Sequence, residues 1–283
     1  MASFTNIATL SYNGNQVNSN VVSGEILEVL AVNKTAIPTT YTQGDTVTYV
    51  INLINSSGTA LTDLTLSDNL GGYTFETGTV YPLQYVEGSA RYFADGAVQT
   101  APTVTAGPPL VFTGINVPAN GTASIVYQAI VTNYASPAED GAVNNTVTVT
   151  GSGLTAAQTA TAQLTAEQTA RLDITKSLSP AVVAENGQLT YTFTIRNFGP
   201  TALETSDNAS VTDTFNPLLR DISVSYNGAA WQAPADYTYD TATGVFSTVP
   251  GRITVPAATY TRNIDGTWNI TPGTAVITVT GTI

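Results

Sequence analysis

Three kinds of side chain that can react with one another recur in two sets along this sequence. A lysine amine can attack an asparagine carboxamide when both are buried, because burial lowers the pKa of the lysine and raises that of a nearby acid. The protonated acid polarises the amide carbonyl, ammonia leaves, and a covalent link between two strands remains. The candidate residues are Lys34, Asp68 and Asn145 in one set, and Lys176, Asp213 and Asn6 in the other.

The same residues also have an ordinary structural interpretation. Lysines at the start of a strand, as we expect for Lys34 and Lys176, are commonly solvated. Aspartates cap turns, and asparagines bond to the backbone. The recurrence of all three residue types in both sets raises the reactive interpretation above chance, but the spacing alone leaves both open.

The segments that carry these residues alternate with a period of two, which is typical of half-buried strands. They are rich in Val, Ile, Thr and Tyr and are separated by Gly, Pro, Asn and Asp turns. Examples are TVTYVINLIN, LTLSDNL, ASIVYQAIV, NTVTVTG, LTYTFTIRN and AVITVTGTI. This pattern predicts an all-β protein built from Ig-like β-sandwiches. Only LTAEQT, residues 164–169, suggests a turn of helix.

An internal repeat divides the chain into two copies of one domain. The matches at an offset of 142 residues are Lys34 with Lys176, Pro38 with Pro180, Tyr49 with Tyr191, and Asn55 with Asn197. We therefore expect a first Ig-like domain over residues 26–168 and a second over residues 169–283. Residues 1–25 remain as a separate segment in front of the first copy.

The two copies differ at their ends. The first copy continues into NNTVTVTGSG, residues 144–153, which predicts a closing hairpin, whereas no such hairpin follows GTAVITVTGTI in the second copy. A segment with the same signature, TNIATLSYNG, stands instead at residues 5–14. We expect this N-terminal hairpin to complete the second domain of another copy of the chain, with Asn6 in the place of Asn145.

Alternation within the donor hairpin places Phe4, Ala8, Leu10 and Tyr12 on one face, which we expect to point into the receiving core. A sandwich without its closing hairpin exposes unpaired strand edges that accept another strand. Since donor and acceptor lie at opposite ends of the chain, the contact joins different surfaces and predicts a head-to-tail homopolymer, an open filament. Closure of the hairpin onto its own chain is the competing outcome.

These motifs resemble a known family. The pattern K-T-x-x-P, G-D-T-V-T-Y, L-x-L-x-D-N-L and N-x-T-V-T-V, over residues 34–70 and 144–149, is similar to the conserved repeat domain of unknown function number eleven. That resemblance implies an Ig-like module of extracellular or cell-surface proteins, with a structural or adhesive role. The set of Lys, acid and Asn on separate strands resembles the one that forms spontaneous isopeptide bonds in Gram-positive pilins and collagen-adhesin domains.

Composition excludes several other classes of function. Twenty acidic and 8 basic residues give a net charge of −12, which argues against nucleic acid or an anionic membrane as partner. Histidine and cysteine are absent, so we expect no enzyme, no cofactor and no metal centre. The sequence shows neither a readable signal peptide nor an apolar run long enough to span a membrane, which leaves the export route unknown.

Two weaker possibilities remain. Tyr226, Trp231, Tyr237 and Tyr239 gather around the turn Asn227-Gly228 and could form a sugar platform, although core packing is the commoner use of such rings. The alternative to a filament subunit is therefore a monomeric surface adhesin or carbohydrate-binding module. Acids such as Asp63 and Asp207 could bind Ca²⁺, but their spacing favours turn capping.

Overall fold

The computed structural model describes residues 2–283, so that Met1 of the expected donor segment lies outside the described residues. Strands account for nearly all of the regular structure, which confirms the expected all-β fold. A short 3₁₀ helix, η1 (Thr205–Asp207), is the exception among these residues. The helical turn expected at residues 164–169 is wrong, because Leu164 and Ala166 are buried, alternating residues at the end of strand β18 (Gln158–Ala166).

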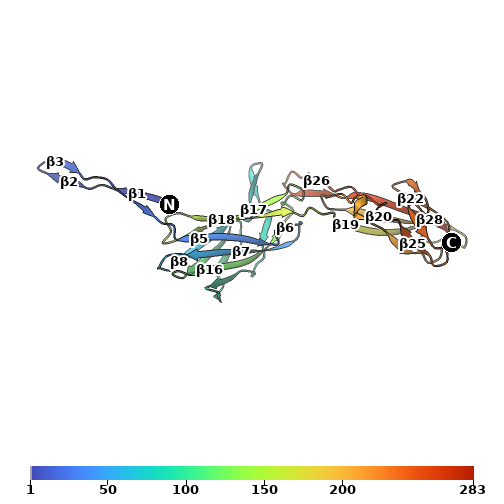
Figure 1. The fold of residues 1–283 in the computed structure, drawn as a ribbon, viewed down its shortest axis with the longest axis horizontal. Coiled ribbons are helices and arrows are strands. Elements are labelled where there is room, and N and C mark those ends of the chain that lie inside the picture. Colours follow the sequence, from blue (N-terminus) through green and yellow to red (C-terminus); the bar gives the residue numbers. More distant parts are fainter. Residues whose placement is uncertain (1) are drawn as a thin grey trace. The chain divides into compact units, whose positions relative to one another are not determined.

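The N-terminal segment is a two-stranded antiparallel ribbon (Figure 1). Strand β1 (Ala2–Asn6) pairs with β4 (Val22–Ile26), and β2 (Thr9–Tyr12) pairs with β3 (Asn15–Asn18). Asn13 and Gly14 turn the chain with φ of 43° and 82°, as a two-residue hairpin loop requires. The side chains of residues 3–23 are all exposed. This hairpin therefore presents its apolar side chains to solvent.

The chain divides into two compact units, of which unit 1 holds residues 1–135 and 142–165, and unit 2 holds residues 136–141 and 166–283. In unit 1 one sheet has the order β13-β12-β16-β7-β5, with β11 also paired to β16. Its strands are β5 (Leu30–Ile37), β7 (Thr46–Asn55), β11 (Leu83–Tyr85), β12 (Arg91–Ala94), β13 (Ala97–Val98) and β16 (Thr122–Val131).

The second sheet of unit 1 has the order β14-β15-β8-β17-β18-β6. Its strands are β6 (Thr40–Tyr41), β8 (Leu61–Asp68), β14 (Thr103–Thr105), β15 (Leu110–Val117), β17 (Ala142–Thr150) and β18. A separate small hairpin joins β9 (Tyr73–Phe75) to β10 (Gly78–Val80). Every second residue of β7, β16 and β17 is buried, so the alternation seen in the sequence lines the core between the sheets.

Unit 2 has a sheet of order β19-β20-β28-β22-β23, a smaller sheet of order β21-β25-β24 and a hairpin β26-β27. The strands are β19 (Leu172–Ser179), β20 (Gln188–Asn197), β21 (Thr212–Thr214), β22 (Arg220–Tyr226), β23 (Ala229–Trp231), β24 (Tyr237–Tyr239), β25 (Val245–Thr248), β26 (Thr259–Arg262), β27 (Trp268–Thr271) and β28 (Gly273–Thr282).

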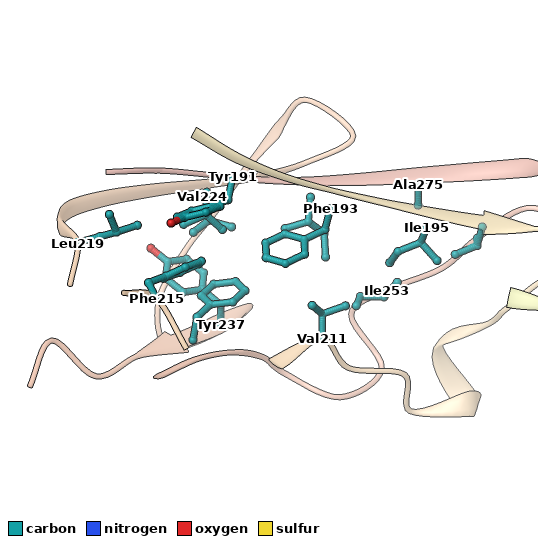
Figure 2. Close-up of a cluster of buried hydrophobic side chains, with 14 of the residues drawn as sticks. Tyr191, Phe193, Ile195, Val211, Phe215, Leu219, Val224, Tyr237, Ile253 and Ala275 are labelled. Atoms are coloured by element: carbon teal, nitrogen blue, oxygen red, sulfur yellow. The ribbon is translucent and has the colours of Figure 1, made fainter. Parts of the chain in front are cut away.

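The core of unit 2 is aromatic. Figure 2 shows Tyr191 and Phe193 of β20 facing Phe215 and Tyr237 across the space between the sheets. The rings of Tyr191 and Phe215 stack with their centroids 4.8 Å apart. Such ring contacts stabilise a core beyond the burial of its apolar area, so unit 2 has a substantial core of its own.

The repeat makes strands of the two units equivalent. Asn55 and Asn197 are both buried, and each donates from Nδ2 to a carbonyl four residues on, that of Thr59 at 2.8 Å and that of Thr201 at 2.7 Å. This equivalence matches β5, β7, β8 and β16 of unit 1 to β19, β20, β21 and β28 of unit 2. Among the described residues of unit 2, no strands correspond to β17 and β18.

Candidate assembly groove and Lys-Asp-Asn sites

The first reactive set meets in the core of unit 1. Lys34 lies on β5 of one sheet, and Asp68 and Asn145 lie on β8 and β17 of the other. Alternation turns all three side chains inward, and as whole residues Lys34, Asp68 and Asn145 are 3%, 0% and 0% exposed. Lys34 is the fifth residue of its strand, so the expected position at a strand start and the solvated interpretation are both wrong for this residue.

Hydrogen bonds hold the carboxylate of Asp68 from three directions. Lys34 Nζ donates to Asp68 Oδ2 at 2.6 Å, and the backbone N–H of Leu70 donates to Oδ1 at 3.0 Å. The hydroxyl of Tyr127, from β16, donates to Oδ2 at 2.5 Å. These bonds satisfy a charged group that would otherwise be very costly to bury.

The electrostatics of this site follow from its burial. Loss of water lowers the pKa of Lys34 from 10.5 to about 8, although the neighbouring carboxylate of Asp68 opposes the shift. Burial also raises the pKa of the hydroxyl groups of Tyr49 and Tyr127. The two tyrosine rings stack with centroids 5.3 Å apart, and Lys34 Nζ lies 4.9 Å from the centroid of the Tyr49 ring. Burial therefore favours the neutral amine of Lys34 more than water does.

The amide of Asn145 meets the acid through a third residue. Asn145 Nδ2 donates to the Tyr127 hydroxyl at 3.0 Å, and among the described residues Asn145 Oδ1 accepts no hydrogen bond. We expected Asp68 to polarise this carbonyl directly, whereas the structure places Tyr127 between the acid and the amide. The sequence motifs do not point to Tyr127. Its place in the alternating segment ASIVYQAIV, which turns its side chain inward, is the one signal for it.

The second set is half assembled and open to solvent. Lys176 of β19 and Asp213 of β21 form an ion pair, with side-chain exposures of 39% and 20% compared with 0% for both members of the pair in unit 1. Lys176 Nζ lies 4.3 Å from the ring centroid of Tyr191 and 5.4 Å from that of Phe215. No asparagine amide bonds to either charged residue within residues 2–283. Asn6 lies exposed at the end of β1, and its pairing with Lys176 stays a prediction.

The edge of β21 explains this exposure. In unit 1, β8 pairs with β15 on one side and β17 on the other, whereas β21 pairs with β25 and has no second neighbour among the described residues. Positions covered in unit 1 are consequently open in unit 2. Leu172 is 45% exposed where the equivalent Leu30 is 4% exposed, and Leu178 is 41% exposed where Ala36 is 7% exposed.

A groove of about 180 Å³ lies beside this open edge. Its walls come from β19, from Ile195 and Leu203, and from the segment just before β21. The lining residues are Leu172, Asp173, Ile174, Ile195, Leu203, Ala209, Ser210, Val211 and Ile253. They are mostly apolar, as in the core that β17 covers in unit 1.

The expected donor residues Phe4, Leu10 and Tyr12 are 52%, 64% and 52% exposed on the ribbon, and Ala8 is exposed as well. They thus present apolar side chains that remain largely exposed to solvent, although the ring of Phe4 lies over Gly24 of β4. Whether they enter the groove of unit 2 stays a prediction.

The four aromatic residues considered as a sugar platform pack in or against the core of unit 2. Tyr226 and Trp231 stack with their centroids 4.9 Å apart, and Tyr237 is buried in the core, where its ring packs on Phe246. The Tyr239 hydroxyl donates to the Leu219 carbonyl at 3.1 Å. Within residues 2–283 no three acidic side chains gather into a group that could hold a metal ion, and no helix is long and apolar enough to cross a membrane.

Comparisons with known proteins add likenesses of fold. No family model matches the sequence, and no curated protein matches it. The structure is similar to the pilus backbone RrgB of Streptococcus pneumoniae, at 12% identity over 86% of this chain, with a TM-score of 0.36. It is also similar to BcpA, the major pilin subunit of Bacillus cereus, at 11% identity over 96% of this chain, with a TM-score of 0.36. A third likeness is to the collagen adhesin CNA of S. aureus, at 14% identity over 56% of this chain, with a TM-score of 0.31.

The chain spans only part of these proteins. The matches cover 55% of the pilus backbone, 73% of the major pilin and 56% of the collagen adhesin.

Proposed function

We propose that this chain is a structural subunit of an extracellular filament, and that the hairpin of residues 1–25 completes unit 2 of the next subunit. One observation carries the proposal: unit 2 has an open edge and an open groove where unit 1 has β17 and β18, while an exposed hairpin with the sequence signature of β17 is present in the same chain. Strand addition to an exposed sheet edge is a common mode of assembly.

Unit 1 supplies a template for the register of insertion. There, β17 runs antiparallel to β8 with Val147 opposite Asp68, Thr148 opposite Ser67 and Val149 opposite Leu66. Matching Asn6 to Asn145 and Asp213 to Asp68 places Ala8 opposite Asp213, Thr9 opposite Thr212 and Leu10 opposite Val211. Phe4, Asn6, Ala8 and Leu10 then take the inward positions that Val143, Asn145, Val147 and Val149 hold in unit 1.

Side-chain sizes agree with this register at the far end of the groove. In unit 1, Gly151 follows β17 and lies so close to Leu64 that an added Cβ would come within 2.6 Å of its Cδ2. The position equivalent to Leu64 in unit 2 is Ala209, which lines the groove. The smaller residue leaves room for Tyr12, which stands in the hairpin where unit 1 has Gly151. In unit 1 the acceptor strand supplies the large residue of this contact, Leu64. In the proposed contact the donor strand supplies it, as Tyr12.

Burial supplies the driving force. Each large apolar side chain that enters the groove gains about 1.5–3 kcal/mol. Backbone bonds between β2 and β21 add about 0.5–1.5 kcal/mol each. The exposed leucines of β19 would be covered at the same time, which removes an apolar patch that a free subunit would present to solvent.

Assembly by this contact extends without limit. The donor hairpin and the acceptor groove are different surfaces, so the contact is heterologous and forms a filament unless the hairpin closes onto its own chain. The resemblance of both copies to the repeat domain of unknown function number eleven supports a location outside the cell. No cofactor, nucleic acid or membrane insertion enters this function.

Covalent cross-links are the finer part of the proposal. We assign a Lys34–Asn145 isopeptide bond to unit 1, since the amine, the acid and the amide meet there in an apolar interior. In unit 2, Lys176 and Asp213 form two members of the set, and we assign the third to Asn6 of the neighbouring subunit. Insertion would bury this pair and bring all three groups together, which joins successive subunits through a second bond.

Engineered disulfides test the donor register directly, because the native chain contains no cysteine. Variant Thr9→Cys/Thr212→Cys places the two thiols at directly opposed positions, where a disulfide can form under mild oxidation. We expect polymers that are separated by reductant, measured in an Asn6→Ala background so that no isopeptide bond obscures the result. The matched control Thr5→Cys/Thr212→Cys is out of register by four residues and should form few cross-links.

The same experiment separates the alternatives. A disulfide within a single chain, seen as an oxidised monomer at all protein concentrations, would mean that the hairpin closes on its own unit 2. A lack of disulfide together with a monodisperse monomer would overturn strand donation and favour the monomeric adhesin or carbohydrate-binding module.

A further inference from the structure

The hydroxyl of Tyr127 bridges two groups of the proposed cross-linking reaction, the carboxyl of Asp68 and the amide of Asn145. It donates to Asp68 Oδ2 at 2.5 Å and accepts from Asn145 Nδ2 at 3.0 Å. It therefore lies between the acid that receives the proton of Lys34 and the nitrogen that must leave. Tyr127 is fully buried, so water has no ready access to either bond.

We propose that Tyr127 is a catalytic residue of the Lys34–Asn145 reaction, which relays a proton from Asp68 to the departing nitrogen of Asn145. This inference rests on the proposed isopeptide bond and assigns the residue that delivers the leaving group its proton. An amide nitrogen is a poor leaving group until it is protonated, so that a positioned acid is needed at this atom.

The protons and electrons of the step balance. Lys34 begins as an ammonium with three protons and ends as an amide nitrogen with one, so it releases two. Its lone pair forms a bond to Cγ of Asn145 while the carbonyl electrons move to Oδ1, and their return breaks the Cγ–Nδ2 bond. In this tetrahedral adduct Nδ2 is an amine with a basic lone pair, so both hydrogen bonds of Tyr127 reverse: protonated Asp68 donates to the Tyr127 oxygen, and the Tyr127 hydroxyl gives its proton to Nδ2, which leaves as ammonia. Tyr127 regains a proton from Asp68, which keeps the second one as a neutral acid.

The second unit lacks this group. Tyr127 faces Tyr49 across β16 and β7, and the corresponding pair in unit 2 is Val279 facing Tyr191. A valine can relay no proton. The bond between Lys176 and a neighbour's Asn6 should consequently form more slowly than the bond within unit 1.

The test follows bond formation from the moment of synthesis. Full-length protein is made in a cell-free reaction, samples are denatured at intervals, and trypsin digestion is read by mass spectrometry. A free Lys34 is cleaved, whereas the bond joins residues 1–91 to residues 92–171 with a loss of about 17 Da, the mass of ammonia. Tyr127→Phe should react roughly 100-fold more slowly or worse, the scale of one lost general acid.

Two comparisons make the result specific. Tyr85→Phe removes the hydroxyl of another buried tyrosine that bonds neither Asp68 nor Asn145, and it should react at the wild-type rate. Replacement of Tyr127 by 3,5-difluorotyrosine keeps the ring and hydroxyl but makes the hydroxyl more acidic, and it should accelerate the reaction. This second variant remains informative if Tyr127→Phe does not fold, as circular dichroism will show.

The outcomes distinguish the relay from the bond itself. If wild-type protein shows no cross-linked peptide, the proposed isopeptide bond is absent and the relay falls with it. If the wild type and a folded Tyr127→Phe variant react equally fast, or the difluorotyrosine variant is no faster than wild type, the bond stands and the relay is overturned.

Discussion

Equivalent residues of the repeat have opposite surroundings. Lys34 and Lys176 are 142 positions apart and each pairs with an aspartate, yet the side chain of Lys34 is 0% exposed and that of Lys176 is 39% exposed. The difference arises because β17 covers the first pair, and no described strand covers the second. At the residue scale, a single covering strand thus decides whether a lysine of this repeat is buried or solvated.

The shifted pKa of Lys34 makes stability depend on pH when the cross-link cannot form. In Asn145→Ala, the folded state releases the Lys34 proton near pH 8, while the unfolded chain holds it until about pH 10.5. The unfolded state binds more protons in this window, so the unfolding free energy of unit 1 should rise from pH 8 to pH 10. Denaturant titrations followed by circular dichroism measure this slope. Lys34→Met/Asn145→Ala should have no slope from this group, and equal slopes in both variants would contradict the assignment.

A second prediction at this scale concerns the face of the donor strand. Leu10→Asp should abolish filaments, because insertion would bury an unpaired carboxylate in the groove. Ser11→Asp adds the same charge to the neighbouring position, which faces outward in the proposed register, and should still assemble. Negative-stain electron microscopy and sedimentation compare the two. Filaments from Leu10→Asp and none from Ser11→Asp would show that the opposite face points inward.

At the element scale, the N-terminal ribbon and the β17-β18 hairpin share an alternating sequence pattern but differ in burial. In unit 1, Val147 and Val149 are fully buried between the sheets, whereas Leu10 of the ribbon is 64% exposed. Backbone pairing within each hairpin is satisfied in both cases. What the ribbon lacks is a second surface to pack on, so its two strands pair with each other but form only a marginally stable hairpin with an unburied apolar face.

Removal of the ribbon separates folding from assembly. Deletion of residues 1–24 should leave a chain that forms no filaments and has an unstable unit 2. Adding a peptide of residues 1–24 should restore the stability of unit 2 without polymerisation, since each groove is then filled and no chain carries a donor. Both tryptophans, Trp231 and Trp268, lie in unit 2, so their fluorescence reports its unfolding alone.

The matched control is the same peptide with Leu10→Asp, which should not stabilise the truncated chain. Filaments formed by the truncated protein, or equal stabilisation by both peptides, would refute the assigned role of the hairpin.

At the scale of the whole molecule, donor and acceptor belong to the same chain but not to the same surface. In the proposed filament, the net charge of −12 would keep separate filaments apart, while the apolar groove of unit 2 would provide a local, specific contact. Polymer length would then be set by subunit supply and by the rate at which hairpins leave their grooves. Covalent closure between Lys176 and a neighbour's Asn6 would make that departure impossible.

Boiling in detergent measures this last property. Wild-type filaments should give a ladder or material too large to enter a gel. Because the bond at Lys34 blocks cleavage there, trypsin should release residues 172–196 joined to residues 1–91, which are joined in turn to residues 92–171. Asn6→Ala and Asp213→Ala should each remove the ladder and leave filaments that detergent dissolves. A single monomer band from the wild type would restrict the assembly to non-covalent strand donation.

The sequence by itself determined the all-β fold, because period-two alternation and turn residues are local signals that can be read without a partner. It also located the repeat, since equal offsets between residues such as Tyr49 and Tyr191 need no three-dimensional information. The residue types of both candidate sites were visible for the same reason. The expected helical turn at residues 164–169 failed because packing of Leu164 and Ala166 into the core outweighs weak local propensity.

Only the tertiary structure decided which of these residues touch. It placed Lys34 beside Asp68, inserted Tyr127 between Asp68 and Asn145, and left Lys176 and Asp213 beside an open groove. Each of these contacts joins strands that are distant in sequence, and burial depends on what lies on the other side of the core. Alternation says that a residue points inward, but the identity of its partners and the presence of a covering strand are properties of the folded sandwich.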